Sequence, residues 1–140
     1  MDIARAIAVA ATLAAAGGST AAPASAAPVL SGNYLMSQTN AAGQTTVTEW
    51  NINPCGDGCA DIKAGAGTSR AQIVDGQWVL DMFDNIRCSD TVRVPYAASA
   101  HLTWDPVTLV GTNRQVYLQP ACGQPSGYTQ VNRVQLKPAG

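Results

Sequence analysis

Hydrophobic and polar residues alternate along most of the chain after residue 27, as they do in strands with one buried face. In "TTVTEWNI", Trp50 and Ile52 fall on one face, while Glu49 and Asn51 fall on the other. Strands with this or a looser alternation are predicted over residues 31–40, 45–52, 59–65, 71–83, 91–98, 101–104, 109–120 and 128–138. No helix-length pattern separates these segments, so the fold class is predicted to be all-β.

Turn residues and breaks in the alternation divide the pattern further. Asp75-Gly76 stands between two apolar runs and fits a two-residue type I′ hairpin turn, which needs positive φ at both positions. Pro95 gives the ladder no N–H, so it predicts an edge strand or a bend. Val131 has the wrong parity relative to Val134 and Leu136, which predicts a bulge near Asn132.

About eight short antiparallel strands joined by tight turns admit two architectures. The first is an up-and-down β-barrel, which we favour because consecutive hairpins are visible and no long crossing loop is seen. The alternative is a two-sheet β-sandwich. An eight-stranded barrel has an interior that side chains fill or that holds one small ligand.

The N-terminal segment has the features of an export signal. Residues 1–26 contain Arg5, an apolar run and the small-residue stretch "AAPASA", which predicts a secretory signal peptide cleaved after Ala26. Residues 27–140 then form a single secreted β domain, extracellular or in the cell envelope, with no transmembrane span after cleavage. The net charge of −1 and the lack of a basic cluster argue against nucleic-acid binding, and we expect a monomer.

Four cysteines in an exported domain predict two disulfides. Of the three pairings, we favour Cys55–Cys59, because glycines at 56 and 58 let the chain double back, together with Cys88–Cys122. A metal site is not expected, since the chain has one His and no second close cysteine pair. A redox pair would need C-x-x-C at a helix N-terminus, and no cofactor is implied.

The order of motifs resembles a known group of proteins. Gly32-x-Tyr34, Trp50 before "PCGDGC", then "DGQW", a later cysteine, "WDPVTLVGT" and a final "VQLKP" follow one another. This order is similar to small secreted and extracytoplasmic disulfide-containing β domains of mycobacteria and related actinobacteria. The resemblance spans about Leu30 to Pro138 and implies the fold, the compartment and the disulfides, without an assigned activity. Some such modules look like the outer parts of sensor proteins, a pattern from which this sequence departs because it shows neither a membrane span nor a kinase domain.

Candidate catalytic residues are few. His101 is the one histidine, and a Ser-His-Asp hydrolase would have to use it. Its parity with Thr103, opposite Leu102, places it on the outer face of a strand. Asp81 and Asp84 are candidates for an acid and base pair, but turn chemistry explains Asp84 equally well. We therefore predict no catalytic residues and no enzyme.

Aromatic residues are the candidates for contact with a ligand or partner. Trp50, Trp78 and Trp104 would line a cavity or form the core. In the strand near residue 116, Val116 and Leu118 are assigned to the buried face, so Tyr117, like Phe83, is predicted to be exposed. The predicted function is a secreted non-enzymatic binding domain for a small ligand or an envelope protein. The alternatives are a structural or interaction protein without a ligand pocket, related to the outer domains of sensor proteins, and, less favoured, a hydrolase.

Overall fold

The computed structural model describes residues 28–65 and 67–140 of the chain. The predicted signal peptide at 1–26 lies outside the described residues. Eight strands follow one another within the described part: β2 (Gly32–Thr39), β3 (Thr45–Gly56), β4 (Cys59–Ala64), β5 (Gly67–Val74), β6 (Gln77–Arg87), β7 (Arg93–Trp104), β8 (Val110–Tyr117) and β9 (Thr129–Pro138).

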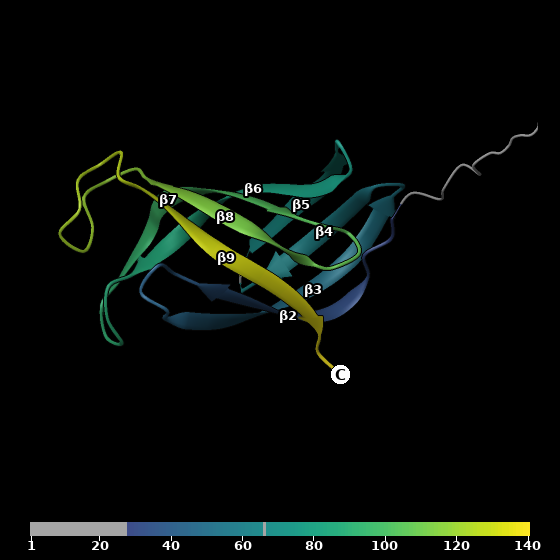
Figure 1. Ribbon diagram of the computed structural model, residues 1–140, viewed down its shortest axis with the longest axis horizontal. Coiled ribbons are helices and arrows are strands. Elements are labelled where there is room, and N and C mark those ends of the chain that lie inside the picture. The colour runs from purple at the N-terminus through teal and green to yellow at the C-terminus, as the bar shows by residue number, and fades with distance from the viewer. Residues whose placement is uncertain (1–27, 66) are drawn as a thin grey trace, which may run out of the picture.

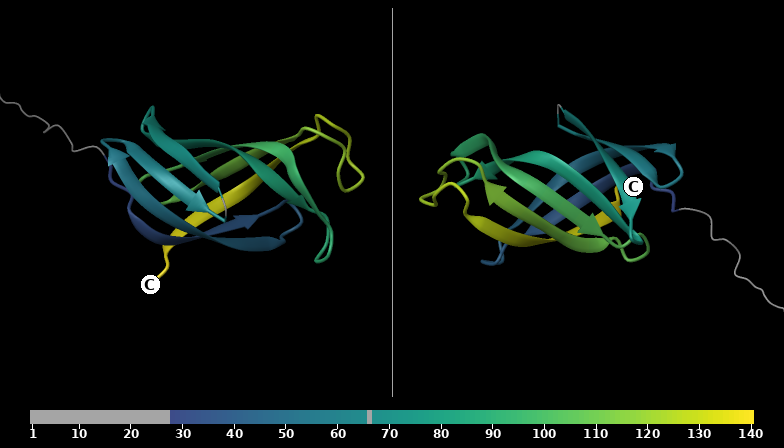
Figure 2. Two further views of the ribbon diagram at one scale, coloured as in Figure 1. Left: turned by 180° about the vertical axis from the view of Figure 1, so that it is seen from behind. Right: turned by 90° about the horizontal axis from the view of Figure 1, so that it is seen from above.

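Each strand pairs antiparallel with the next in sequence, and β2 pairs with β9, which closes a barrel. Figures 1 and 2 show the strands wrapping around one axis, with the long loop between β8 and β9 projecting at one end. The up-and-down barrel is confirmed, and the sandwich alternative is wrong. Closure gives every strand a neighbour on both sides for at least part of its length, which reduces exposed sheet edges.

One half of the barrel interior is packed with apolar side chains. Trp104 lies between Trp50 and Trp78, with ring centroids 5.8 and 6.3 Å away. The core around these rings also contains Leu30, Met36, Ile52, Ala60, Ile62, Ala71, Leu80, Ala100, Leu102, Val134 and Leu136. The predicted buried faces of "TTVTEWNI" and of "HLTW" are therefore confirmed. We call this half the tryptophan end.

Two tight turns at the tryptophan end follow from local chemistry. Asp75 and Gly76 have φ values of +51° and +82°, as a type I′ turn requires, so this predicted hairpin is confirmed. In the loop after β7, the Asp105 carboxylate accepts hydrogen bonds from the backbone N–H groups of Thr108 and Val107, at 2.8 and 2.7 Å. These bonds, led by that from Thr108, lower the pKa of Asp105.

The irregularities of the sheet differ in part from those predicted. Residues 91–98 and 101–104 belong largely to one long strand, β7, whose register with β6 shifts between Asp84 and Ile86. Pro95 and Tyr96 lie in the β7 segment opposite this shift, and Tyr96 has a φ of +50°. The predicted bend at Pro95 is therefore confirmed. The bulge near Asn132 is wrong: β9 pairs with β8 without interruption, and Val131 simply faces outward.

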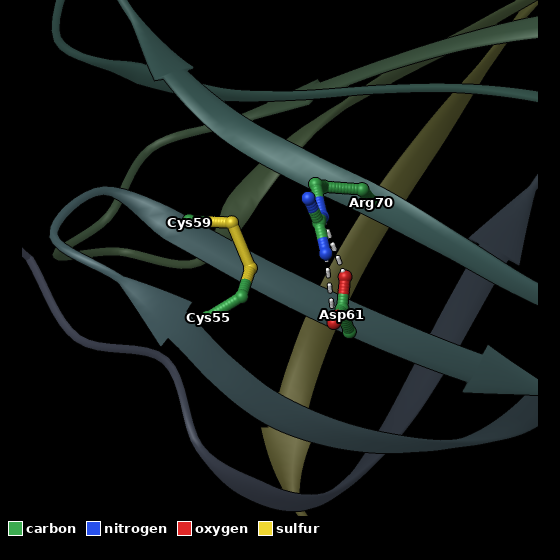
Figure 3. Close-up of polar contacts among 4 residues, drawn as sticks. All are labelled: Cys55, Cys59, Asp61 and Arg70. Atoms are coloured by element: carbon green, nitrogen blue, oxygen red, sulfur yellow. Dashed lines mark hydrogen bonds and ion pairs between the residues drawn. A yellow bond between two sulfur atoms is a disulfide. The ribbon is translucent and has the colours of Figure 1, made fainter.

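Both predicted disulfides are confirmed. Cys55–Cys59 joins the end of β3 to the start of β4 with Cα atoms 5.0 Å apart (Figure 3). Cys88–Cys122 joins the β6–β7 loop to the β8–β9 loop with Cα atoms 5.2 Å apart. Such bridges fit an oxidising compartment. The second bridge ties together two loops at the end opposite the tryptophans, which carries loops 40–44, 88–92 and 118–128 and which we call the polar end.

The β4–β5 hairpin stops before it reaches the polar end. Its last pair with β3 joins Ala64 to Trp50, although β3 continues back to Thr45. On the other side, β5 pairs with β6 only from Val74 to Ala71, although β6 runs on to Arg87. Toward the polar end, β3 and β6 therefore each lack a paired strand on one side.

The outer face of the β4–β5 hairpin carries an ion pair. The Arg70 Nε donates to Asp61 Oδ1 at 2.8 Å, and this bond lowers the pKa of Asp61 (Figure 3).

Candidate functional site

Strand β8 turns three polar residues into the barrel. Asn113, Gln115 and Tyr117 are 1 %, 3 % and 5 % exposed, while Leu118 is 49 % exposed. The predicted parity of this strand, and with it the exposure of Tyr117, is therefore wrong. The physical reason is that the interior of the polar end is built from amides, so hydrophobicity does not mark the inward face of β8.

These inward polar residues form a hydrogen-bonded network. Gln115 Nε2 donates to Asp84 Oδ2 at 2.8 Å. Gln115 Oε1 accepts from Gln130 Nε2 at 2.7 Å and from Asn132 Nδ2 at 3.2 Å. Beside this chain of contacts, Asn113 pairs with Asn132 in the register of β8 and β9. Through these contacts and the bond from Asn113 to Gln38, side chains of β2, β6, β8 and β9 come together. We call the six residues the amide network: Gln38, Asp84, Asn113, Gln115, Gln130 and Asn132.

Two members of the amide network are left with an unsatisfied oxygen. Asn113 Oδ1 and Asn132 Oδ1 are buried and have no hydrogen-bond partner among the described residues. The Asn113 amide nitrogen is used, since Nδ2 donates to Gln38 Oε1 at 2.5 Å. A buried acceptor without a donor costs roughly 1–3 kcal/mol. Two such acceptors on neighbouring strands need an explanation, and a hydrogen-bond donor from outside the chain would provide one.

The interior is open to solvent beside this network. Thr46 and Thr48 point inward, because they pair with Gln38 and Met36 and alternate with the buried Trp50. Both threonines are nevertheless exposed, and Gln38 and Gln130 are half-buried. The early end of the β4–β5 hairpin explains this exposure, since no strand covers this part of β3. Gln38 lies opposite Thr46 in the pairing of β2 with β3, and its side chain contacts Asn113, which carries one of the unsatisfied oxygens.

A second, smaller hydrophobic cluster lies at the polar end. Tyr117 packs edge-on against Tyr128 with ring centroids 5.1 Å apart, and Ile86, Ala97, Ala98 and Ala121 surround them. Burial is the main cause that raises the pKa of Tyr117. The cluster lies next to Cys88 and Cys122 in sequence, so the disulfide and the tyrosine pair together hold the loops beside the amide network.

The remaining aromatic candidates divide into two groups. Trp50, Trp78 and Trp104 are buried against one another and fill the tryptophan end. Phe83 lies on the outer face and is 63 % exposed. The structure therefore does not bring the five aromatic candidates to one place.

Two of the three candidate catalytic residues, Asp81 on β6 and His101 on β7, lie on the outer face of the barrel. His101 Nδ1 is 2.6 Å from Asp81 Oδ1, and Arg114 is the neighbour of His101 on β8. An open groove of about 240 Å³ runs over these residues, and its lining also includes Phe83, Ser99 and Val116. Asp84 faces inward, so it does not meet Asp81. Among the described residues no hydrogen bond joins Ser99 to His101, so the nucleophile and base of a triad are not assembled.

One more hollow belongs to the loop between β8 and β9. A hollow of about 580 Å³ is lined only by residues 120–125, which makes it the concave side of one loop. No group of three metal-ligating side chains gathers in residues 28–65 and 67–140. The part of the chain that the structure describes contains no helix long and apolar enough to cross a membrane.

Comparison of the chain with protein-family models, with curated proteins and with solved structures gave no match.

The amide network was missed from the sequence. Its members are Gln38, Asp84, Asn113, Gln115, Gln130 and Asn132. One signal was available: in "VNRVQL", Asn132 has the same parity as Val134 and Leu136. A polar residue on an apolar face indicates a buried polar site, but a bulge explained it as readily.

Proposed function

We propose that the protein is a secreted, non-enzymatic binding domain that receives a small polar ligand inside the polar end of its barrel. The observation that carries the proposal is the pair of buried, unsatisfied oxygens of Asn113 and Asn132 beside an open stretch of inward surface. Ligand sites are typically concave and hold a few precisely placed polar groups. The amide network has that composition.

The rest of the barrel supports binding over catalysis. The tryptophan end is packed with side chains, which leaves the polar end as the part of the interior that a ligand would enter. The amide network contains no serine, cysteine or histidine, and its one carboxylate, Asp84, accepts hydrogen bonds from Gln115 and from the Asn85 N–H. The two disulfides support an oxidising compartment, and the N-terminal segment that reads as an export signal supports secretion. A relation to the exported β domains of mycobacteria and related actinobacteria is part of this proposal.

Neighbouring residues on β3 provide a matched test. Thr48 faces inward at the opening, and Val47 faces outward and is 59 % exposed. Thr48→Trp would fill the opening, whereas Val47→Trp adds the same ring to the outer surface. The assay is a thermal-shift screen of lipids, sterols, glycans and small polar compounds against the mature chain.

We expect a polar compound to raise the melting temperature of the wild type and of Val47→Trp, but not of Thr48→Trp. A compound that stabilises Thr48→Trp as strongly as the wild type would place the binding site elsewhere. Stabilisation by sterols or lipids alone would contradict a polar site.

The second candidate function is docking on an envelope protein through the outer face. Phe83, Val131 and Leu118 are 63 %, 56 % and 49 % exposed, and large apolar residues on a solvent face favour a contact surface. Retention of the protein on isolated cell-envelope material distinguishes the two candidates. If docking is the function, Phe83→Ser releases the protein and Thr48→Trp does not.

A further inference from the structure

Asp84 sets the direction of the hydrogen bonds in the amide network. A carboxylate oxygen only accepts, so Gln115 must turn its Nε2 toward Asp84 and its Oε1 away. That oxygen in turn requires N–H donors, and Gln130 and Asn132 supply them. The amide of Asn132 is thereby fixed with its nitrogen on Gln115 and its oxygen directed elsewhere.

The result of this polarity is a site that lacks donors. Asn132 Oδ1 has no partner because its amide is oriented by Gln115, and Asn113 Oδ1 has none because Nδ2 is committed to Gln38. Both unsatisfied atoms of the network are acceptors. A group that completes the site must therefore bring N–H or O–H donors.

The charge of the barrel interior indicates the charge of the ligand. Asp84 is the only charged residue among the inward-facing positions of the eight described strands, since the lysines and arginines of these strands all alternate outward. Its half-buried carboxylate accepts from Gln115 and from the backbone N–H of Asn85, and no ion pair to it is formed among the described residues. A partly desolvated negative charge with no cation beside it favours a positive ligand.

We propose that the ligand is an organic cation that carries N–H donors, with a primary ammonium as its simplest form. This inference rests on the proposed function. The ammonium hydrogens satisfy Asn113 Oδ1 and Asn132 Oδ1, and the positive charge is balanced by Asp84 through the field of the barrel interior. Access from the side of Thr46 and Thr48 requires movement of the half-buried side chains of Gln38 and Gln130, not of the backbone.

The experiment is a set of NMR titrations that follow the side-chain amide signals of the isotopically labelled mature chain. The probes are n-butylammonium, tetramethylammonium and 1-pentanol. Tetramethylammonium keeps the charge and lacks the donors. 1-Pentanol is one carbon longer, keeps a linear alkyl chain and one donor, and lacks the charge.

Two variants separate the role of Asp84 from general electrostatics. Asp84→Asn removes the interior carboxylate, and Asp90→Asn removes an exposed carboxylate of the β6–β7 loop. Both change the net charge equally. We expect n-butylammonium to shift the signals of Asn113 and Asn132 with a dissociation constant at least tenfold lower than that of either other probe. We expect Asp84→Asn to weaken this binding at least tenfold and Asp90→Asn to leave it unchanged.

Each contrary outcome has a distinct meaning. If 1-pentanol binds at the same amides as tightly as n-butylammonium, the ligand class is overturned and the proposed site stands. If tetramethylammonium binds as tightly, the donor requirement is overturned. If Asp84→Asn binds like the wild type while its amide spectrum remains folded, the role of Asp84 is overturned. If no probe shifts these amides and the thermal-shift screen also fails, both the inference and the proposed function are overturned.

Discussion

Gly111 on β8 lies directly opposite Trp104 on β7, where no space for a side chain exists. A Cβ atom on Gly111 would lie 2.6 Å from the Trp104 Cα and would also clash with the Thr103 carbonyl oxygen. The glycine therefore lets β8 approach β7 at the level of the tryptophan core. Its role is close approach and not conformational freedom, since no positive φ occurs there.

This contact predicts that Gly111→Ala destabilises the barrel by about 3 kcal/mol, because the clash is with backbone atoms that cannot move aside. Urea unfolding measures the effect. Gly67→Ala is the matched control, because a Cβ at Gly67 meets nothing within 4 Å and its φ is not in the positive range. Equal stability of the two variants would contradict this reading of the β7–β8 contact.

The two disulfides should contribute unequally. Cys88–Cys122 closes a loop with a sequence separation of 34, and Cys55–Cys59 one with a separation of 4. Chain-entropy scaling assigns about 4 kcal/mol to the longer loop and about 2 kcal/mol to the shorter. We expect the double replacement Cys88→Ser and Cys122→Ser to lower the free energy of unfolding more than Cys55→Ser with Cys59→Ser. The reverse order in urea unfolding would contradict this assignment.

Tyr117 predicts a loss of stability in base. Burial raises its pKa above 10.0 in the folded state, because the charged phenolate is disfavoured inside the barrel. The stabilising contribution is fully present below the pKa of the unfolded chain and is lost as the pH rises through the folded pKa. Between pH 9 and pH 12, Tyr117→Phe should therefore lose less stability than the wild type.

The control for this pH profile is Tyr96→Phe, because Tyr96 is 72 % exposed. Its profile should follow that of the wild type. If Tyr117→Phe has the same alkaline slope as Tyr96→Phe, then burial of Tyr117 is not the cause of the slope.

Asn132 should show the signature of a residue kept for binding. Asn132→Leu removes a buried oxygen that has no donor, and Gln115 Oε1 still accepts from Gln130. We expect the free energy of unfolding to stay within about 1 kcal/mol of the wild type or to rise. Binding of the polar ligand should be lost. A large destabilisation on urea unfolding would show that Asn132 serves the fold instead.

The sequence was sufficient for the apolar half of this molecule. Trp50, Trp78 and Trp104 stand on strands whose alternation is clear, and Asp75-Gly76 permits one turn type, so these elements were predictable from local rules. The disulfide pairing was also within reach, because glycines at 56 and 58 favour a short ring and only one pairing then remains.

The polar half could not be predicted in the same way. Hydrophobicity assigns Val116 inward and Gln115 outward, whereas the structure has them reversed, because the partners of Gln115 come from β6 and β9. Only the closed barrel shows that Asp84, distant in sequence, accepts a hydrogen bond from the Gln115 amide and so offsets the cost of burying it. The opening was hidden for a related reason, since it depends on where the β4–β5 hairpin ends relative to β3 and β6.

The most direct test of the central claim is a crystal structure of the mature chain with the most strongly stabilising compound of the thermal-shift screen. We predict that the compound lies inside the polar end of the barrel, within hydrogen-bond distance of Asn132 Oδ1 and reached past Thr48. A compound found instead in the outer groove over His101 and Phe83, with the amide network unchanged, would contradict the account.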